Sequence, residues 1–213
     1  MQQRKVVTRS GRGYRGYFPS KKLNRMVEWE SILERDAILH FEFSPGIITY
    51  QEQPELITYI YQEQTKRYFP DFLLILRNRN LFHVEIKPLS KLRSPNLISK
   101  FEAIIERYET HPAKFRLLTD QYLRFEPRLA NLKLLATAQR CNEDLNKARE
   151  LCKELLDKDS PIVVSRLVNS IGLKQTLSLL ACGEIMCDLN LALDSDSNFV
   201  RFVEGIDHDA LLI

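Results

Sequence analysis

The chain has 213 residues, of which 44% are hydrophobic and 28% are charged, and its formal net charge is +3. This length suits one large or two small domains, and the composition is that of a folded protein with a sizeable core. No apolar run reaches membrane-spanning length and the N-terminus has no apolar signal region, so we expect a cytosolic protein.

The first 25 residues are strongly basic. They contain no acidic residue and eight basic ones: Arg4, Lys5, Arg9, Arg12, Arg15, Lys21, Lys22 and Arg25. A cationic segment of this kind is typical of nucleic-acid binding, whereas the alternative is a solvated tail. Tyr14, Tyr17 and Phe18 favour binding, because aromatic rings stack on bases. We predict that residues 1–20 form an extended arm and that the eight basic side chains contact DNA.

The next elements predict an α/β domain over residues 21–140. Helical spacing of apolar residues indicates a helix from about 22–24 to Phe41, which Ser44-Pro45-Gly46 ends. Strand-like runs follow at 47–51, 56–62, 68–76 and 81–87, with a polar turn at 77–80. A helix near 97–108 and a buried strand at 115–119 complete the domain. This order of elements predicts a mixed sheet flanked by helices.

Residues 141–213 differ in their pattern of apolar and charged residues from the segment before them, and they carry a charge of about −6. We predict helices at 142–156, 162–171 and 175–182 and a hairpin of 190–193 with 199–203. This is the outline of a small winged-helix-like α+β domain. The region also holds the four cysteines, which form no CxxC pair and are expected as reduced core thiols: Cys141, Cys152, Cys182 and Cys187.

Three polar residues of the paired strands 68–76 and 81–87 suggest a catalytic site. The period of two places Glu85 and Lys87 on one face, and Asp71 begins the partner strand, where it can approach Glu85. Two carboxylates suit a hard cation such as Mg²⁺ or Mn²⁺, and a lysine beside them can act on a bound water. The pattern therefore favours a metal-dependent phosphodiester nuclease over a hairpin with solvated charges.

A third carboxylate is expected from the first helix. Glu34 lies within its apolar stripe, where an unpaired charge would be costly to bury, and a metal would supply a partner. Glu30, one turn earlier, is the rival for this role. Weaker candidates are His83, for which we expect solvent exposure, and Asp120 with Gln121, which follow the strand at 115–119 and could line the site.

Several motifs resemble one known family. They are Phe18-Pro-Ser-Lys-Lys-Leu-Asn-Arg-Met-Val, Glu30-Ser-Ile-Leu-Glu-Arg-Asp36, Tyr50-Gln-Glu-Gln-Pro54, Tyr68-Phe-Pro-Asp-Phe72 and Val84-Glu-Ile-Lys-Pro88. Together they are similar to the TnsA-type endonuclease subunit of Tn7-like transposons. The resemblance implies a restriction-endonuclease-like core followed by a winged-helix domain. It places the catalytic and metal-binding carboxylates at Glu34, Asp71 and Glu85, and the catalytic lysine at Lys87.

The resemblance also implies a function. Such a nuclease cuts the 5′ (non-transferred) strand of double-stranded DNA at transposon ends, while a separate DDE transposase cuts and joins the 3′ strand. An AAA+ ATPase regulator is the other implied partner, and we expect residues 141–213 chiefly to bind this regulator because their charge opposes DNA binding. The alternatives are a resolvase or restriction-type nuclease that acts alone, and a DNA-binding adaptor without activity.

Overall fold

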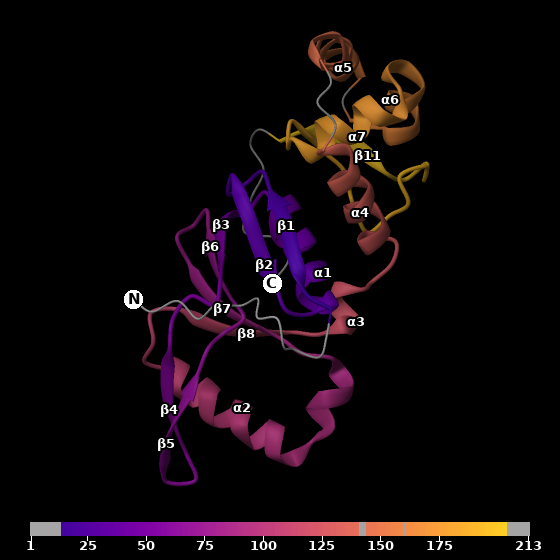
Figure 1. The fold of residues 1–213 in the computed structure, drawn as a ribbon. Coiled ribbons are helices and arrows are strands. Elements are labelled where there is room, and N and C mark those ends of the chain that lie inside the picture. Colours follow the sequence, from indigo (N-terminus) through magenta and orange to yellow (C-terminus); the bar gives the residue numbers. More distant parts are fainter. Residues whose placement is uncertain (1–13, 141–143, 160, 204–213) are drawn as a thin grey trace. The chain divides into compact units, whose positions relative to one another are not determined.

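The computed structural model describes residues 14–140, 144–159 and 161–203. Its contacts divide the chain into two compact units, one ending at Leu123 and the other beginning at Arg124. Each unit has its own helices and its own sheet (Figure 1). Within the described residues, no helix combines the length and the apolar character that crossing a membrane requires.

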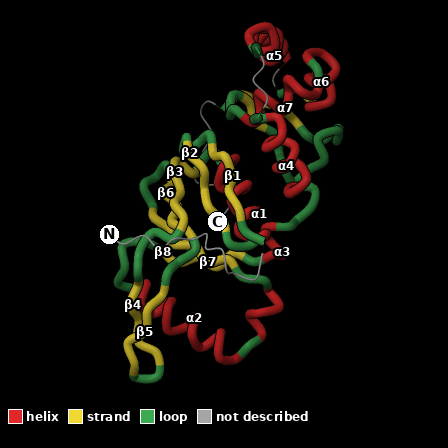
Figure 2. The backbone as a smooth tube through the Cα atoms, in the orientation of Figure 1, coloured by secondary structure: helices red, strands yellow, loops and turns green. Residues whose placement is uncertain are grey.

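A four-stranded sheet forms the centre of the first unit. Its order is β3 (Ile47–Glu52), β6 (Phe72–Leu76), β7 (Leu81–Ile86) and β8 (Lys114–Leu118). The first three strands are antiparallel and β8 runs parallel to β7, so the predicted mixed sheet is confirmed. Figure 2 shows these strands in yellow and the helices around them in red. The parallel pair needs a crossover, which the chain makes through η1 (Leu89–Arg93) and α2 (Pro95–Tyr108).

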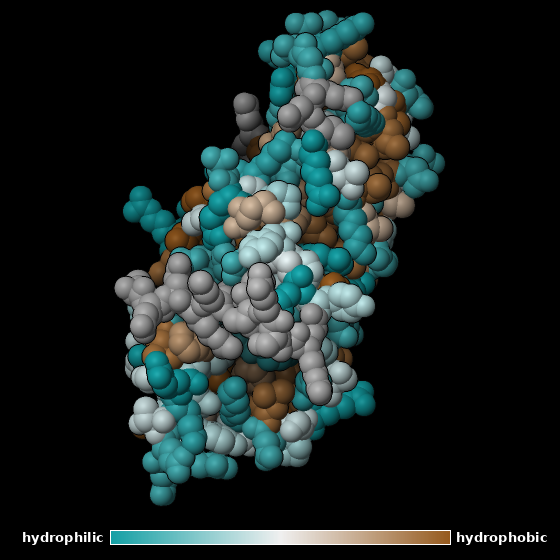
Figure 3. All heavy atoms as spheres, viewed as in Figure 1, coloured by the Kyte–Doolittle hydropathy of each residue, from teal (hydrophilic) through white to brown (hydrophobic). Residues whose placement is uncertain are grey.

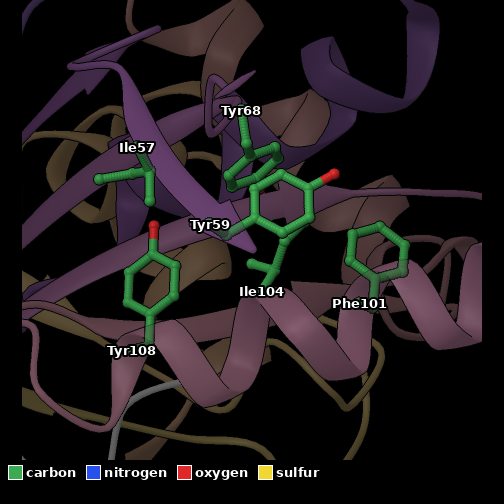
Figure 4. Packing of buried hydrophobic residues seen from close by; sticks show 6 residues of the cluster. All are labelled: Ile57, Tyr59, Tyr68, Phe101, Ile104 and Tyr108. Atoms are coloured by element: carbon green, nitrogen blue, oxygen red, sulfur yellow. The ribbon is translucent and has the colours of Figure 1, made fainter. Parts of the chain in front are cut away.

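Helices cover both faces of this sheet. On one face α1 (Ile32–Phe43) packs with the ring centroids of Phe41 and Phe72 5.3 Å apart. On the other face α2 packs with the hairpin of β4 (Ile57–Tyr61) and β5 (Gln64–Tyr68). Buried residues between them form what we call the aromatic cluster, which is Ile57, Tyr59, Tyr68, Phe101, Ile104 and Tyr108 (Figure 4). Outside this cluster the hairpin carries mostly hydrophilic side chains (Figure 3).

Residues 16–29 form a hairpin, so the prediction of an arm to residue 20 and a helix from residue 22 was wrong. β1 (Gly16–Ser20) pairs antiparallel with β2 (Arg25–Trp29), and α1 begins only at Ile32. Short apolar runs satisfy strand and helix spacing almost equally well. Here the tertiary contacts of the hairpin turn decide between the two.

A buried carboxylate and a partly buried ammonium hold the hairpin turn against α1. The carboxylate of Glu42 accepts hydrogen bonds from Ser20 Oγ and from the backbone N–H groups of Lys21 and Lys22. The ammonium of Lys22 donates to the carbonyls of Phe41, Ser44 and Ile47, at 2.7, 2.7 and 2.8 Å. Lys22 therefore donates to carbonyls at the C-terminal end of α1 and at the start of β3.

The remaining strand predictions of the first unit were close, with one correction. The run predicted as one strand at 68–76 contains the end of β5 and, after Pro70 and Asp71, the separate strand β6. Proline interrupts the strand because it has no N–H to donate to a neighbouring strand. The predicted helix and strand at 97–108 and 115–119 correspond to α2 and β8. The short helix α3 (Asp120–Leu123) follows β8.

In its described residues, 124–140, 144–159 and 161–203, the second unit contains four helices and a small sheet. In chain order its elements are α4 (Arg128–Ala138), α5 (Asn146–Asp159), β9 (Ile162–Val163), α6 (Val164–Ile171), α7 (Leu173–Ala181), β10 (Ile185–Met186) and β11 (Phe199–Phe202). The strands are ordered β10-β11-β9 and are antiparallel. We expected the boundary near residue 140, whereas α4, which we did not predict, packs against α7 within this unit.

Details of the second unit also correct the sequence predictions. Gly172 makes the predicted turn between α6 and α7 with a φ of +95°, a conformation that glycine adopts without strain. The hairpin strand expected at 190–193 was wrong, because β11 pairs with β10 instead. Cys152 is buried as expected, but Cys182 is exposed. Cys141 lies outside the described residues.

Candidate active site

Asp71 and Glu85 lie next to each other at one end of the β6–β7 hairpin. Asp71 directly precedes β6, and the hairpin register pairs Phe72 with Val84. The backbone N–H of Ile86 donates to Oδ2 of Asp71 at 2.7 Å, so the register fixes the first carboxylate beside the second strand. The side chain of Glu85 projects from this strand and is only 5% exposed. The two carboxylates are thus positioned by local pairing of adjacent strands.

Lys87 places its ammonium between these carboxylates. Its Nζ lies 2.6 Å from Oε1 of Glu85 and 3.6 Å from Oδ2 of Asp71. Burial alone would lower the pKa of Lys87, but the two carboxylates more than offset this and raise the pKa above its ordinary value. The lysine is therefore protonated at neutral pH. Its side chain is 33% exposed, so water and substrate can reach it.

The site concentrates more negative charge than one lysine neutralises. Burial is the main reason that the pKa of Asp71 rises to about 7. The negative charges of Glu85 and Glu34 raise this pKa further, whereas Lys87 and the Ile86 N–H oppose the rise. Carboxylates crowded in this way are stabilised by a bound cation.

Glu34 is part of a capping box at the start of α1. Its backbone N–H donates to Oγ of Ser31, and its carboxylate accepts from that hydroxyl at 2.9 Å and from the backbone N–H of Glu30 at 2.7 Å. The hydrogen-bond partners of the Glu34 carboxylate thus lie within four residues of it. The sequence argument, which expected a metal as partner, did not anticipate them. Burial raises the pKa of Glu34 above its ordinary value, and the charge of Lys87 acts against this rise. Glu34 therefore also lies within electrostatic range of the site.

The two weaker carboxylate candidates, Glu30 and Asp120, both take part in hydrogen bonds that fix the local backbone. Glu30, the rival of Glu34, precedes α1, and its backbone N–H is a partner of the Glu34 carboxylate. Asp120 accepts a hydrogen bond of 2.7 Å from the backbone N–H of Leu89. The Lys87 N–H donates to the carbonyl of Leu118 at 3.0 Å. Together these two bonds fix the backbone on either side of Pro88, directly after the catalytic lysine candidate.

Sequence reasoning missed Tyr68 as a contributor to the site. Its hydroxyl donates to Oε2 of Glu85 at 2.6 Å, while its ring is buried in the aromatic cluster. Tyr68 belongs to the motif Tyr68-Phe-Pro-Asp-Phe72, and that motif was the only available signal. The contact joins the end of β5 to β7, so no local periodicity could reveal it.

His83 is buried, so the expectation of solvent exposure was wrong. It points to the same side of β7 as Glu85, and its side chain is only 1% exposed. The residues that cover it come from α2 and from the segment before β8. Its Nδ1 lies 2.8 Å from the hydroxyl of Tyr108, and its ring centroid lies 5.3 Å from that of His111.

The basic residues of the N-terminal segment differ in their surroundings. Arg4, Lys5, Arg9 and Arg12 lie outside the described residues, whereas Arg15 and Lys21 are described. The ammonium of Lys22 donates to three backbone carbonyls, so a phosphate contact by this residue would have to compete with those bonds. Arg25 forms a bidentate pair with Glu52, with both N–O distances at 2.5 Å. That pair competes with any phosphate contact.

The residues of the site fit a hard divalent cation. Asp71 and Glu85 supply the carboxylate oxygens that Mg²⁺ and Mn²⁺ prefer. A carboxylate oxygen has two lone pairs, so the bonds from Tyr68 and Lys87 leave Glu85 able to bind a metal. The raised pKa of Asp71, caused first by burial and then by neighbouring carboxylates, gives a reason for a cation to bind here.

Comparison with known proteins identifies one segment of the chain. Residues 44–120 match the family model described as TnsA-like endonuclease N terminal, and this segment contains Asp71, Glu85 and Lys87. Glu34 precedes the matched segment. No curated protein matches the chain. This match supports the resemblance drawn from the sequence motifs, because residues 44–120 are similar to the N-terminal domain of TnsA-like endonucleases.

Proposed function

We propose that this chain is a Mg²⁺- or Mn²⁺-dependent DNA endonuclease that cuts the 5′ strand at the ends of a Tn7-like transposon. One observation carries the proposal: Lys87 lies within 2.6 Å of Glu85 and 3.6 Å of Asp71, inside the segment that matches the endonuclease family. The DNA substrate would place the protein in the cytoplasm, at the nucleoid during transposition.

The side chains suggest how phosphodiester hydrolysis would proceed. Asp71 and Glu85 would hold the divalent cation, with Glu34 bound directly or through water. When bound, the cation would lower the pKa of a coordinated water and neutralise charge on the scissile phosphate. Lys87 would donate a hydrogen bond to the attacking water or to the phosphate oxygen on which negative charge develops. Tyr68 would keep Glu85 in one orientation throughout.

We assign the 3′ strand and the regulation to partners. A DDE transposase would cut and join the 3′ strand, and an AAA+ ATPase would regulate the pair. The nuclease would be inactive alone, which protects DNA from unprogrammed cuts. This part of the proposal depends on the family, since it concerns proteins that the chain meets rather than residues within it.

We propose that the second unit is a winged-helix domain that docks a partner. The order α5-β9-α6-α7-β10-β11, with β11 between β10 and β9, supports this classification. Residues 141–213 carry a charge of about −6, which favours a protein partner over the DNA backbone for this part of the unit, whereas residues 124–140 carry a charge of +3. A pull-down with the full chain and with a chain ending at residue 123 tests this assignment. Equal capture of the ATPase by both chains would contradict it.

The alternatives differ from this proposal in measurable ways. A resolvase or restriction-type nuclease would cut without partners, and an adaptor would bind DNA without cutting it. The adaptor has least support, because it gives no reason for Asp71, Glu85 and Lys87 to converge. A gene for a DDE transposase beside the coding sequence would separate the first two possibilities.

Strand-specific cleavage mapping tests the proposal directly. Transposon-end DNA labelled on either strand is incubated with this chain and Mg²⁺, with and without the neighbouring transposase. We expect cuts in the 5′ strand that require both proteins and the metal, and that Asp71→Ala abolishes without unfolding the chain. Cuts by the Asp71→Ala variant at the normal rate would show that the site is wrongly assigned.

A further inference from the structure

A second group of side chains that can bind a metal lies near the candidate active site. One of its members, His83, lies two residues before Glu85 in β7. Glu55 precedes β4, His83 lies in β7 and His111 lies between α2 and β8. Oε1 of Glu55 is 3.4 Å from Nε2 of His83 and 3.7 Å from Nε2 of His111. One ligand atom from each residue lies within 4.8 Å of the other two. Three segments that are distant in the sequence thus meet at one point.

The chemistry of this group differs from that of the active site. We propose that Glu55, His83 and His111 form a second metal site, which takes Zn²⁺ or a similar transition-metal cation. Two imidazole nitrogens and one carboxylate oxygen suit Zn²⁺, whereas Mg²⁺ prefers oxygen ligands alone. Adjacent ligands of a tetrahedral Zn²⁺ lie a little over 3 Å apart, so the observed separations need only small movements.

The surroundings of His83 favour metal binding. A ligating histidine usually donates its second ring N–H to an oxygen, and the Tyr108 hydroxyl lies 2.8 Å from Nδ1. With the proton on Nδ1, the lone pair of Nε2 faces Glu55.

His111 is the less prepared ligand. The backbone N–H of Ala113 donates to its Nδ1 at 3.0 Å, so in the metal-free protein the proton of the neutral ring lies on Nε2. Metal binding through Nε2 requires the proton to move to Nδ1 and gives up the bond from Ala113. We therefore expect loss of His111 to weaken binding less than loss of Glu55, the anionic ligand.

The position of the site indicates a structural role. A bound metal would join the β3–β4 connection, β7 and the α2–β8 connection around the aromatic cluster. Tyr108 belongs to this cluster and contacts His83, and Tyr68 belongs to it and donates to Glu85. In Figure 4 the α2 residues Phe101, Ile104 and Tyr108 point toward Ile57, Tyr59 and Tyr68. The metal would brace the packing that holds Glu85.

Co²⁺ binding by the full chain tests the site without any nuclease assay. The chain carries Asp71→Asn, and excess Mg²⁺ is present, so that the carboxylate site does not contribute. We expect saturable binding of one Co²⁺ with visible absorption of a low-coordinate complex, displacement by Zn²⁺, and a higher melting temperature with Zn²⁺. Absence of saturable binding would overturn the proposal.

Three variants locate the bound ion. Glu55→Gln changes a side chain that is 45% exposed, so it should fold normally, and we expect at least about tenfold weaker Co²⁺ binding. His111→Gln should weaken binding to a smaller extent. Glu63→Gln, at the exposed turn between β4 and β5, is the matched control and should bind as strongly as the parent. Unchanged binding in both Glu55→Gln and His111→Gln would place the ion elsewhere and refute the site.

Discussion

The hydroxyl of Tyr68 donates a hydrogen bond of 2.6 Å to Oε2 of Glu85. Because the ring of Tyr68 is fixed in the aromatic cluster, the orientation of this carboxylate depends on the packing of α2 against the β4–β5 hairpin. The other oxygen of Glu85 is held by Lys87. A carboxylate restrained at both oxygens can bind a metal in one orientation only, which favours a defined site.

Removal of this hydroxyl should reduce cleavage while the chain remains folded. Tyr68→Phe keeps the ring but frees Glu85 to rotate, and we expect cleavage to slow by roughly tenfold to a hundredfold, as is common for residues that orient metal ligands. The matched control is Tyr59→Phe, which removes a hydroxyl from the same cluster. Single-turnover cleavage in the full assembly measures both variants. Equal rates for the two would mean that Tyr68 only packs.

The geometry around Lys87 predicts that arginine cannot replace it. Lys87 fits its compact ammonium between two carboxylates, whereas a planar guanidinium is larger and directs its N–H groups differently. Lys87→Arg should lower the cleavage rate by roughly a hundredfold or more. Metal and DNA binding should persist, because the charge is kept. Lys91→Arg in η1 is the control, and wild-type cleavage by Lys87→Arg would show that Lys87 is only a surface charge.

The β6–β7 part of the site was predictable from sequence because it is local. Strand alternation and a four-residue turn place Asp71 and Glu85 together once the two strands pair. The same alternation misjudged His83, since it shows which side of a strand a residue faces but not whether another element covers that side. Here α2 and the segment around His111 bury it. Such cover comes from distant segments, and no pattern in the sequence near His83 records it.

The error at residues 22–29 also comes from a contact with a distant segment, whereas the partners of Glu34 are local. Residues 22–29 satisfied helical spacing, but Glu42, more than ten residues later, supplies the hydrogen bonds that fix a turn at Lys21 and Lys22. Glu34 was correctly found as a carboxylate that needs partners. Those partners are Ser31 and Glu30, and the capping pattern Ser31-x-x-Glu34 was legible in the sequence.

The pH dependence of the free energy of unfolding should reveal what ionised Asp71 costs the folded protein. Burial and neighbouring carboxylates raise its pKa from the ordinary 3.8 to about 7, so ionised Asp71 destabilises the metal-free fold above pH 7. This penalty disappears as the pH falls toward 4, because the folded protein then binds the proton. In a chelating buffer, Asp71→Asn should increase the free energy of unfolding at pH 8, on the order of 1–3 kcal/mol.

Urea denaturation of both proteins between pH 4.5 and 8 measures this difference. The gain from Asp71→Asn should shrink steadily as the pH falls through about 7, the pKa of the folded wild type. Saturating Mg²⁺ should remove the gain at pH 8, since a bound cation stabilises the carboxylate. A gain that is constant with pH would mean that the two side chains differ in packing rather than in charge.

One substitution can separate the cap that Glu34 makes at α1 from its proposed role in the site. Glutamine also serves at the third position of a capping box, so Glu34→Gln should keep the cap while removing the negative charge near Lys87. We expect nearly unchanged stability but slower cleavage. Ser31→Ala is the converse control: it should cost about 1 kcal/mol of stability through loss of the cap. Normal cleavage by Glu34→Gln would limit this residue to capping α1.

The last prediction concerns the basic residues within residues 1–13, which can be deleted without cutting into the first strand. Because β1 begins at Gly16, deletion of residues 1–13 removes Arg4, Lys5, Arg9 and Arg12 but leaves the hairpin intact. If these side chains contact phosphates, affinity for duplex DNA should fall, and the slope of log K against log salt should flatten by roughly 0.9 per lost contact.

Arg25→Gln provides the comparison, since Arg25 already pairs with Glu52. It should change the salt slope by much less than the deletion does. Fluorescence anisotropy with transposon-end DNA over a range of salt concentrations measures both. A deletion that leaves the slope unchanged would show that the basic segment makes no phosphate contacts, and DNA binding would then depend on the two folded units.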